Sequence, residues 1–220
     1  MNLRERVVRY PLLLIALFIM ASGVSLSIKA NLGTSPISCV PYVLSLIGPF
    51  TVGEFTIIFN LFLILLQILI LRSDFDLKQL LQIFVIIPFG YFTDFTLYLL
   101  SNITVNGYIF EWITCLLGCI VLAFGIFIEI KAGLLYMPGE GIVIALSKVT
   151  KIEFGKIKPI FDMSMVISAV ILSFAFLGKL MGAREGTIIA AILIGLIVKF
   201  YKDTIGLKVD KIINNLISGN

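Results

Sequence analysis

Histidine is absent from this chain of 220 residues, and charged residues make up only 14% of it. A soluble domain has roughly 25% charged residues, so the chain has too few charges to cover a water-facing surface. Without histidine, it lacks the usual metal ligand and the usual proton relay near neutral pH. It also lacks a GxxxxGK[ST] phosphate loop and a hydrolase constellation built on serine and histidine. ATP hydrolysis and serine-hydrolase chemistry are therefore excluded, and we expect a function that is not enzymatic.

Cysteine is also scarce, and all three cysteines lie in apolar segments: Cys39, Cys115 and Cys119. Cys115 and Cys119 are four residues apart on one predicted helix, where they are expected to behave as small hydrophobic residues. A zinc pair is the alternative, but a zinc site needs a second Cys pair or histidines. We therefore expect no metal site and no cofactor.

Hydrophobic residues make up 60% of the chain, and the mean hydropathy is +1.11. This excess must face lipid rather than water, so the chain is expected to be an all-α polytopic membrane protein. The net charge of +4 comes from Lys and Arg at the edges of apolar runs, not from a clustered basic face, so nucleic acid is not an expected partner. Six apolar runs approach the roughly 20 residues that cross a bilayer: Pro11–Leu26, Phe55–Leu71, Leu77–Leu100, Tyr108–Ile128, Pro159–Leu177 and Gly186–Phe200.

Two shorter apolar stretches, Pro36–Ile47 and Pro138–Val149, are too short to cross. Twelve helical residues reach only about 18 Å of the roughly 30 Å hydrocarbon core. We expect half-helices that enter and leave on one side of the membrane. Interfacial helices lying flat on the surface are the alternative.

An internal repeat relates the two halves of the chain, because residues 28–36, IKANLGTSP, are echoed by residues 130–138, IKAGLLYMP. The register of 102 residues also matches Gly23 with Gly125 and Phe59 with Phe161. The first apolar run follows a basic start and so resembles a signal peptide, but its equivalent recurs in the second half, so we expect it to be retained.

Each repeat would then contain three full spans and one half-helix, and an odd number of spans inverts the second copy. The predicted units are residues 1–100, an external linker at 101–107, and residues 108–220 with a cytoplasmic C-terminal tail. With both termini in the cytoplasm, the inner segments hold all Lys and Arg residues except Lys29, Lys179 and Arg184. Full crossing by the short stretches would move more cations outside, so the positive-inside rule favours six spans over eight.

The motif at 28–36, its echo and the chain length resemble the YczE/YyaS/YitT family of bacterial membrane proteins. This resemblance implies the bacterial cytoplasmic membrane and, as an expectation, a transport role. The second copy departs from the first where Leu135, Tyr136 and Met137 replace Gly33, Thr34 and Ser35. Any site between the halves is therefore expected to be asymmetric.

The half-helices begin with recognisable signals, because Ser35 can cap backbone N–H groups and Pro36 and Pro138 suit the first helical position. Two helix N-termini approaching from opposite faces would meet near the midplane of the membrane and form a binding site there. The residues expected to bind substrate are Lys29, Gly33, Ser35, Ser38, Asn60, Lys131, Gly139 and Glu140.

Several of these residues have simpler roles available. Lys29 and Lys131 can instead reach the headgroups, and Glu140 can complement the dipole of its own helix. Asp94, Asp162 and Glu129 are expected to couple transport to protons or cations. For Asp94 and Asp162, interhelical hydrogen bonding or a place near the interface is the alternative. Glu129 is also expected to pair with a neighbouring lysine.

These patterns predict a small-solute secondary transporter or channel. The alternative is a non-transporting membrane protein that assists an exporter or a biosynthetic complex. The expected partners are the lipid bilayer and a small solute or ion, with a homodimer left open.

Overall fold

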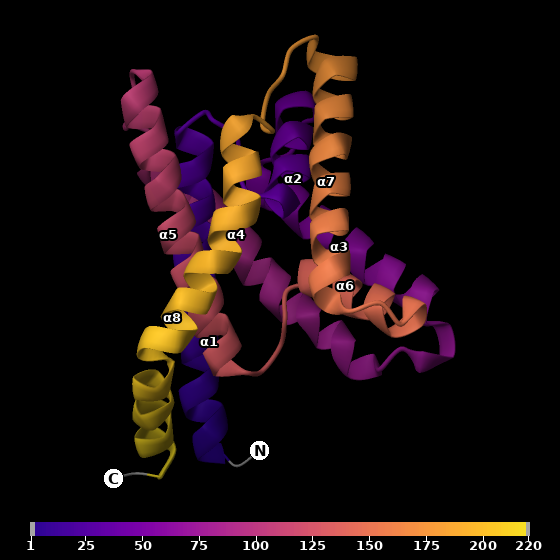
Figure 1. Cartoon of the computed structure of the whole chain (residues 1–220), viewed down its shortest axis with the longest axis vertical. Coiled ribbons are helices and arrows are strands. Elements are labelled where there is room, and N and C mark those ends of the chain that lie inside the picture. The colour runs from indigo at the N-terminus through magenta and orange to yellow at the C-terminus, as the bar shows by residue number, and fades with distance from the viewer. Residues whose placement is uncertain (1–2, 219–220) are drawn as a thin grey trace.

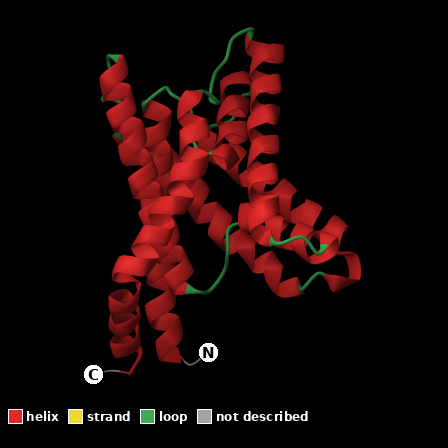
Figure 2. Cartoon of the chain, viewed as in Figure 1, coloured by secondary structure: helices red, strands yellow, loops and turns green. Residues whose placement is uncertain are grey.

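The computed structural model describes residues 3–218, and every regular element within them is helical (Figures 1 and 2). The all-α class is therefore confirmed. The helices are α1 Leu3–Lys29, α2 Pro36–Ile47, α3 Val52–Leu71, α4 Ile83–Leu99, α5 Tyr108–Ala132, α6 Pro138–Thr150, α7 Phe154–Leu177 and α8 Glu185–Ser218. Two short 3-10 helices, η1 Arg72–Asp74 and η2 Leu77–Gln82, connect α3 to α4.

Five segments of the described chain are long and apolar enough to cross a membrane: Arg4–Lys29, Val52–Asp74, Leu77–Leu99, Tyr108–Ala132 and Phe154–Leu177. The sixth predicted span, Gly186–Phe200, begins α8. Its apolar stretch is short because Lys199, Lys202 and Asp203 follow closely. Beyond that point α8 continues as a charged helix to Ser218.

The two short helices have nearly the predicted bounds. α2 has 12 residues and α6 has 13, and a proline begins each of them. Proline is favoured at the first helical position because its missing N–H would have no helical partner there. α2 ends at Ile47, and four residues, Gly48, Pro49, Phe50 and Thr51, separate it from α3.

The buried core consists of two main clusters with different helices around them. One lies among α1, α4 and α5 and includes Leu17, Val85 and Leu122. The other lies among α2, α3, α6 and α7 and includes Val43 and Ile142. Figure 1 shows these two groups side by side, with α8 running along the first.

Helix packing follows a paired pattern across the two halves. α1 packs along α5, while α4 packs on α1 and α8 packs on α5. α2 packs on α7 and α3 packs on α6, so the two short helices each contact a long helix of the other half. α1 begins and α8 ends at the same end of the molecule, and the linker from α4 to α5 lies at the opposite end (Figure 1).

Candidate functional site

A cavity of about 340 Å³ lies between the two core clusters, and residues from each of α1 to α8 line it. Much of its wall is apolar, with Met20, Val24, Phe89, Leu122 and Ile126 from α1, α4 and α5. A volume of this size lies within the range of small-molecule sites. The polar groups described below are concentrated on the side formed by α2, α3, α6 and α7, with Glu129 added from α5.

The N-termini of the two short helices meet at this cavity. Ile37 of α2 and Gly139 of α6 both line it. They lie so close that a Cβ atom on Gly139 would come within 2.6 Å of Ile37 Cδ1. The absence of a side chain at Gly139 therefore permits the close approach of the two helix starts.

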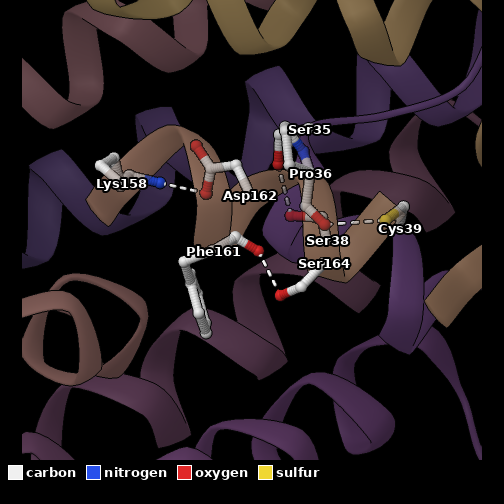
Figure 3. A network of polar contacts seen from close by, with 8 residues as sticks. All are labelled: Ser35, Pro36, Ser38, Cys39, Lys158, Phe161, Asp162 and Ser164. Atoms are coloured by element: carbon white, nitrogen blue, oxygen red, sulfur yellow. Dashed lines mark hydrogen bonds and ion pairs between the residues drawn. The ribbon is translucent and has the colours of Figure 1, made fainter. Parts of the chain in front are cut away.

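Ser35 occupies the N-cap position of α2, but its hydroxyl does not cap the helix, so the expected side-chain cap is wrong. The backbone carbonyl of Ser35 accepts from the N–H groups of Ser38 and Cys39 at 2.9 and 3.0 Å. Its hydroxyl instead donates to Ser38 Oγ at 2.8 Å (Figure 3). Both hydroxyls line the cavity and so present polar groups to its interior.

Lys158 and Asp162 form an ion pair on α7, one helical turn apart. Figure 3 shows this pair beside the first turn of α2, where Ser35 and Ser38 lie. Asp162 is an expected site residue, whereas Lys158 was expected only as one of the inner charges that set the topology. Its spacing of four residues from Asp162 places the two side chains on one helix face, and that signal could have identified Lys158.

Glu129 enters the cavity from α5 and is almost completely buried, with 1% of its surface exposed. Its Oε1 atom accepts from the backbone N–H of Met137 at 3.1 Å, just before α6. Its Oε2 atom has no hydrogen-bond partner among the described residues. The expected pairing with lysine is wrong, because Lys131 pairs instead with Asp210 of α8, with Nζ and Oδ2 2.6 Å apart.

Glu140, in the first turn of α6, links these acidic groups. Its charge acts on Glu129, while the charges of Lys158 and Asp162 act on Glu140. The cavity thus gathers three carboxyl groups and one ammonium group within electrostatic reach of one another. Like charges at such a site repel, and the surrounding apolar walls strengthen every interaction between them.

Asn60 of α3 is 2% exposed and also lines the cavity. Its amide nitrogen donates to the Thr56 carbonyl at 2.8 Å. Its Oδ1 atom has no partner among the described residues. A buried acceptor without a partner costs roughly 1–3 kcal/mol, so a ligand that donates to it would recover stability.

Three of the residues expected to bind substrate lie outside the cavity lining. Lys29 donates to the Ser101 carbonyl at 3.3 Å, and Lys131 is held by Asp210. Gly33 has a φ of +97°, and a Cβ there would approach Thr187 Oγ1 to 2.2 Å. Gly33 therefore permits the loop before α2 to pack on the start of α8.

Asp94 lies on α4 and contacts the beginning of α3. Its carboxylate accepts from Thr51 Oγ1 at 2.6 Å and from the Gly53 N–H at 2.8 Å. A Cβ on Gly53 would lie 2.1 Å from the Gly90 carbonyl, so α3 and α4 are in close contact here. This placement favours the interhelical alternative for Asp94, while its coupling role stays a prediction.

No group of three or more His, Cys, Asp or Glu side chains in residues 3–218 has the arrangement of a metal site.

Comparison with known proteins places the chain in a family. The model of a family of unknown function, DUF6198, matches residues 7–203. A curated relative, the uncharacterized membrane protein YczE of Bacillus subtilis (strain 168), is 29% identical over 200 residues, covering 90% of this chain and 86% of that protein. No solved structure matches the chain. The resemblance to YczE-like proteins is thus confirmed, and the chain is a multi-pass membrane protein that belongs to the DUF6198 family.

Proposed function

We propose that this protein is a secondary transporter or channel for a small solute in the bacterial cytoplasmic membrane, with its binding site in the cavity where α2 and α6 meet. The observation that carries the proposal is that two residues lining that cavity have buried acceptors without a hydrogen-bond partner among the described residues, Glu129 Oε2 and Asn60 Oδ1. Such groups are costly in an apolar interior and are rare without a functional reason. A protein that only presents lipid-facing and partner-facing surfaces would not need them.

The proposal includes an inverted repeat of three spans and one half-helix, and residue contacts support it. A Cβ on Gly23 would lie 2.4 Å from Leu122 N, and a Cβ on Gly125 would lie 2.7 Å from Met20 N. Under the register of 102 residues, Gly23 corresponds to Gly125 and Met20 to Leu122. The two contacts are therefore the same contact made twice, as a two-fold axis between α1 and α5 requires.

The cavity would lie on that axis, because its lining contains equivalent residues from both halves. Gly139 and Ile37, which touch, are themselves equivalent in the register. Further pairs that line the cavity at this spacing are Met20 with Leu122, Val24 with Ile126, Ser35 with Met137, Ser38 with Glu140, Thr56 with Lys158, Asn60 with Asp162, and Phe89 with Ala191. Inverted-repeat transporters bind their substrates at such an interface.

Six spans with both termini in the cytoplasm complete the proposed topology. The sixth span is the apolar first part of α8, and the common end at which α1 begins and α8 ends supports an even number of crossings. The distribution of Lys and Arg supports the orientation through the positive-inside rule. The helix starts of α2 and α6 then face each other from opposite membrane sides.

Access to the cavity from water tests the function. In a cysteine-free background, Ser38→Cys should react with a small charged methanethiosulfonate reagent in right-side-out or inverted vesicles. Ile171→Cys is the control, because Ile171 is exposed on α7 where lipid is expected and its thiol should stay unreactive. Labelling from both sides would indicate a carrier or a channel. A Ser38→Cys thiol that reacts from neither side would overturn the proposal and favour the accessory role.

A further inference from the structure

The charges around the cavity define which ligand it can hold. Lys158 neutralises Asp162 by direct contact, which leaves Glu129 and Glu140 as acidic groups. The two helix N-termini contribute about half a positive charge each. When both glutamates are ionised, the cavity therefore retains about one negative charge.

An acidic side chain of the protein lies close to the start of each short helix, and this disfavours an anion there. Glu129 accepts from the Met137 N–H at the start of α6, and Glu140 lies in the first turn of that helix. At α2, Figure 3 shows Asp162 beside the first turn, where its carboxyl group is paired with Lys158. An anion entering the cavity would meet these carboxyl groups before it met free N–H donors.

The unpartnered atoms favour a ligand that is a cation or a hydrogen-bond donor. Glu129 Oε2 and Asn60 Oδ1 are both acceptors, and their residues are 1% and 2% exposed. A ligand with N–H or O–H donors, or with a positive charge, would satisfy these acceptors. Apolar residues, including Phe89, line the same cavity. An aromatic face attracts a cation, so an organic cation with an apolar body fits better than a hydrated inorganic ion.

The remaining charged groups near these carboxyls do not alter this balance. The cavity residues of α1, α2, α3, α4 and α8 are uncharged. Arg9 of α1 donates to the Ala132 carbonyl at the end of α5, outside the cavity lining. Lys131 of α5 is paired with Asp210 of α8.

On the basis of the function proposed above, we propose that the cavity holds one monovalent positive charge at a time, either a small organic cation or a proton on Glu129 or Glu140. An uncompensated carboxylate is costly in an apolar site, so one positive charge is favoured and a second is not. When the cation binds, the proton leaves a glutamate carboxyl for water. When the cation leaves, a glutamate takes a proton up again, and the protein exchanges cations for protons.

The test uses three probes of one shape and different charge: choline, 3,3-dimethyl-1-butanol and 3,3-dimethylbutanoate. Each is titrated calorimetrically into the purified full chain in dodecylmaltoside, in buffers with different enthalpies of ionisation. Choline should bind most tightly and release about one proton. Its affinity should rise with pH, up to about tenfold per unit, because fewer protons then compete for the glutamates. The neutral alcohol should bind more weakly and release no proton.

Variants separate this exchange from other causes. Glu129→Gln keeps the side-chain size and an acceptor for the Met137 N–H, and should weaken choline binding at least tenfold and remove its pH dependence. If that variant does not fold, Glu140→Gln serves the same purpose, because it removes the other unpaired acidic charge. Glu153→Gln is the matched control, since this glutamate is exposed just before α7 and should leave binding unchanged.

Preference for 3,3-dimethylbutanoate, or choline binding without proton release, would overturn the inference. Failure of all three probes to bind would overturn it as well. In each of these cases the reactivity of Ser38→Cys towards a cationic reagent decides the proposed function separately, because labelling does not require any of the three probes to bind.

Discussion

Replacement of Gly23 by alanine should weaken the contact between α1 and α5. The new Cβ would lie 2.4 Å from Leu122 N and 2.7 Å from Leu122 Cα. Non-bonded carbon atoms are most stable about 3.5–4.0 Å apart, so the helices would have to separate by about 1 Å. Backbone atoms cannot rotate away from the new Cβ as a flexible side chain can. The two helices themselves would therefore have to move apart.

The expected cost follows from that displacement. A gap of about 1 Å forfeits up to about half of each dispersion contact, and overpacking in cores costs about 1–3 kcal/mol. α1 and α5 have the most extensive contact of any helix pair in the described chain, so the cost should lie near 3 kcal/mol. The higher helix propensity of alanine recovers about 1 kcal/mol. The net loss of about 2 kcal/mol should lower the melting temperature by about 4–8 °C.

Gly155→Ala provides the matched control, because a Cβ at Gly155 on α7 would meet nothing within 4 Å. This variant should melt at the same temperature as the parent or slightly above it, since only the helix propensity changes. Thermal unfolding of the purified protein can be followed through Trp112, the single tryptophan, which lies on α5. If Gly23→Ala and Gly155→Ala melt together, the close packing inferred for α1 and α5 is wrong.

Two further predictions concern topology and Asp94. In a cysteine-free background, Asn106→Cys should be labelled by an impermeant thiol reagent from outside intact cells, and Lys148→Cys only from inside. Labelling of both cysteines from one side would contradict the inverted repeat. Asp94→Ala should destabilise the protein by about 1–3 kcal/mol, because it removes the acceptor of the Thr51 hydroxyl and the Gly53 N–H. Asp94→Asn should lose less stability and should keep any pH-driven flux. A stable Asp94→Asn variant without a pH response would restore the coupling role.

Local signals in the sequence are enough to locate the short helices. A proline at each start and about twelve apolar residues determine their type and length, and α2 has the predicted bounds, Pro36–Ile47. The register of 102 residues, which needs only the sequence, also associates Asn60 with Asp162. Both line the cavity, together with Ser35 and Gly139.

Partners of side chains on different helices cannot be predicted in the same way. Asp94 and Thr51 are 43 residues apart, and Lys131 and Asp210 are 79 residues apart. Neither pair follows from helical periodicity, because periodicity gives the face of a residue and not the neighbour opposite that face. The pair of Lys158 and Asp162 differs, because their spacing of four residues on one helix would have predicted it.

The loop before α2 depends on residues that are synthesised about 150 positions later. Its Leu32 carbonyl accepts from the Gly186 N–H at 2.8 Å, and its Asn31 carbonyl accepts from Arg184 at 2.7 Å. Thr34 N–H donates to the Gly182 carbonyl at 3.2 Å. These backbone groups have no such partners until residues 182–186 have been synthesised. The loop before α2 therefore reaches its final contacts only near the end of synthesis, and a chain truncated before residue 182 would leave these backbone groups without those partners.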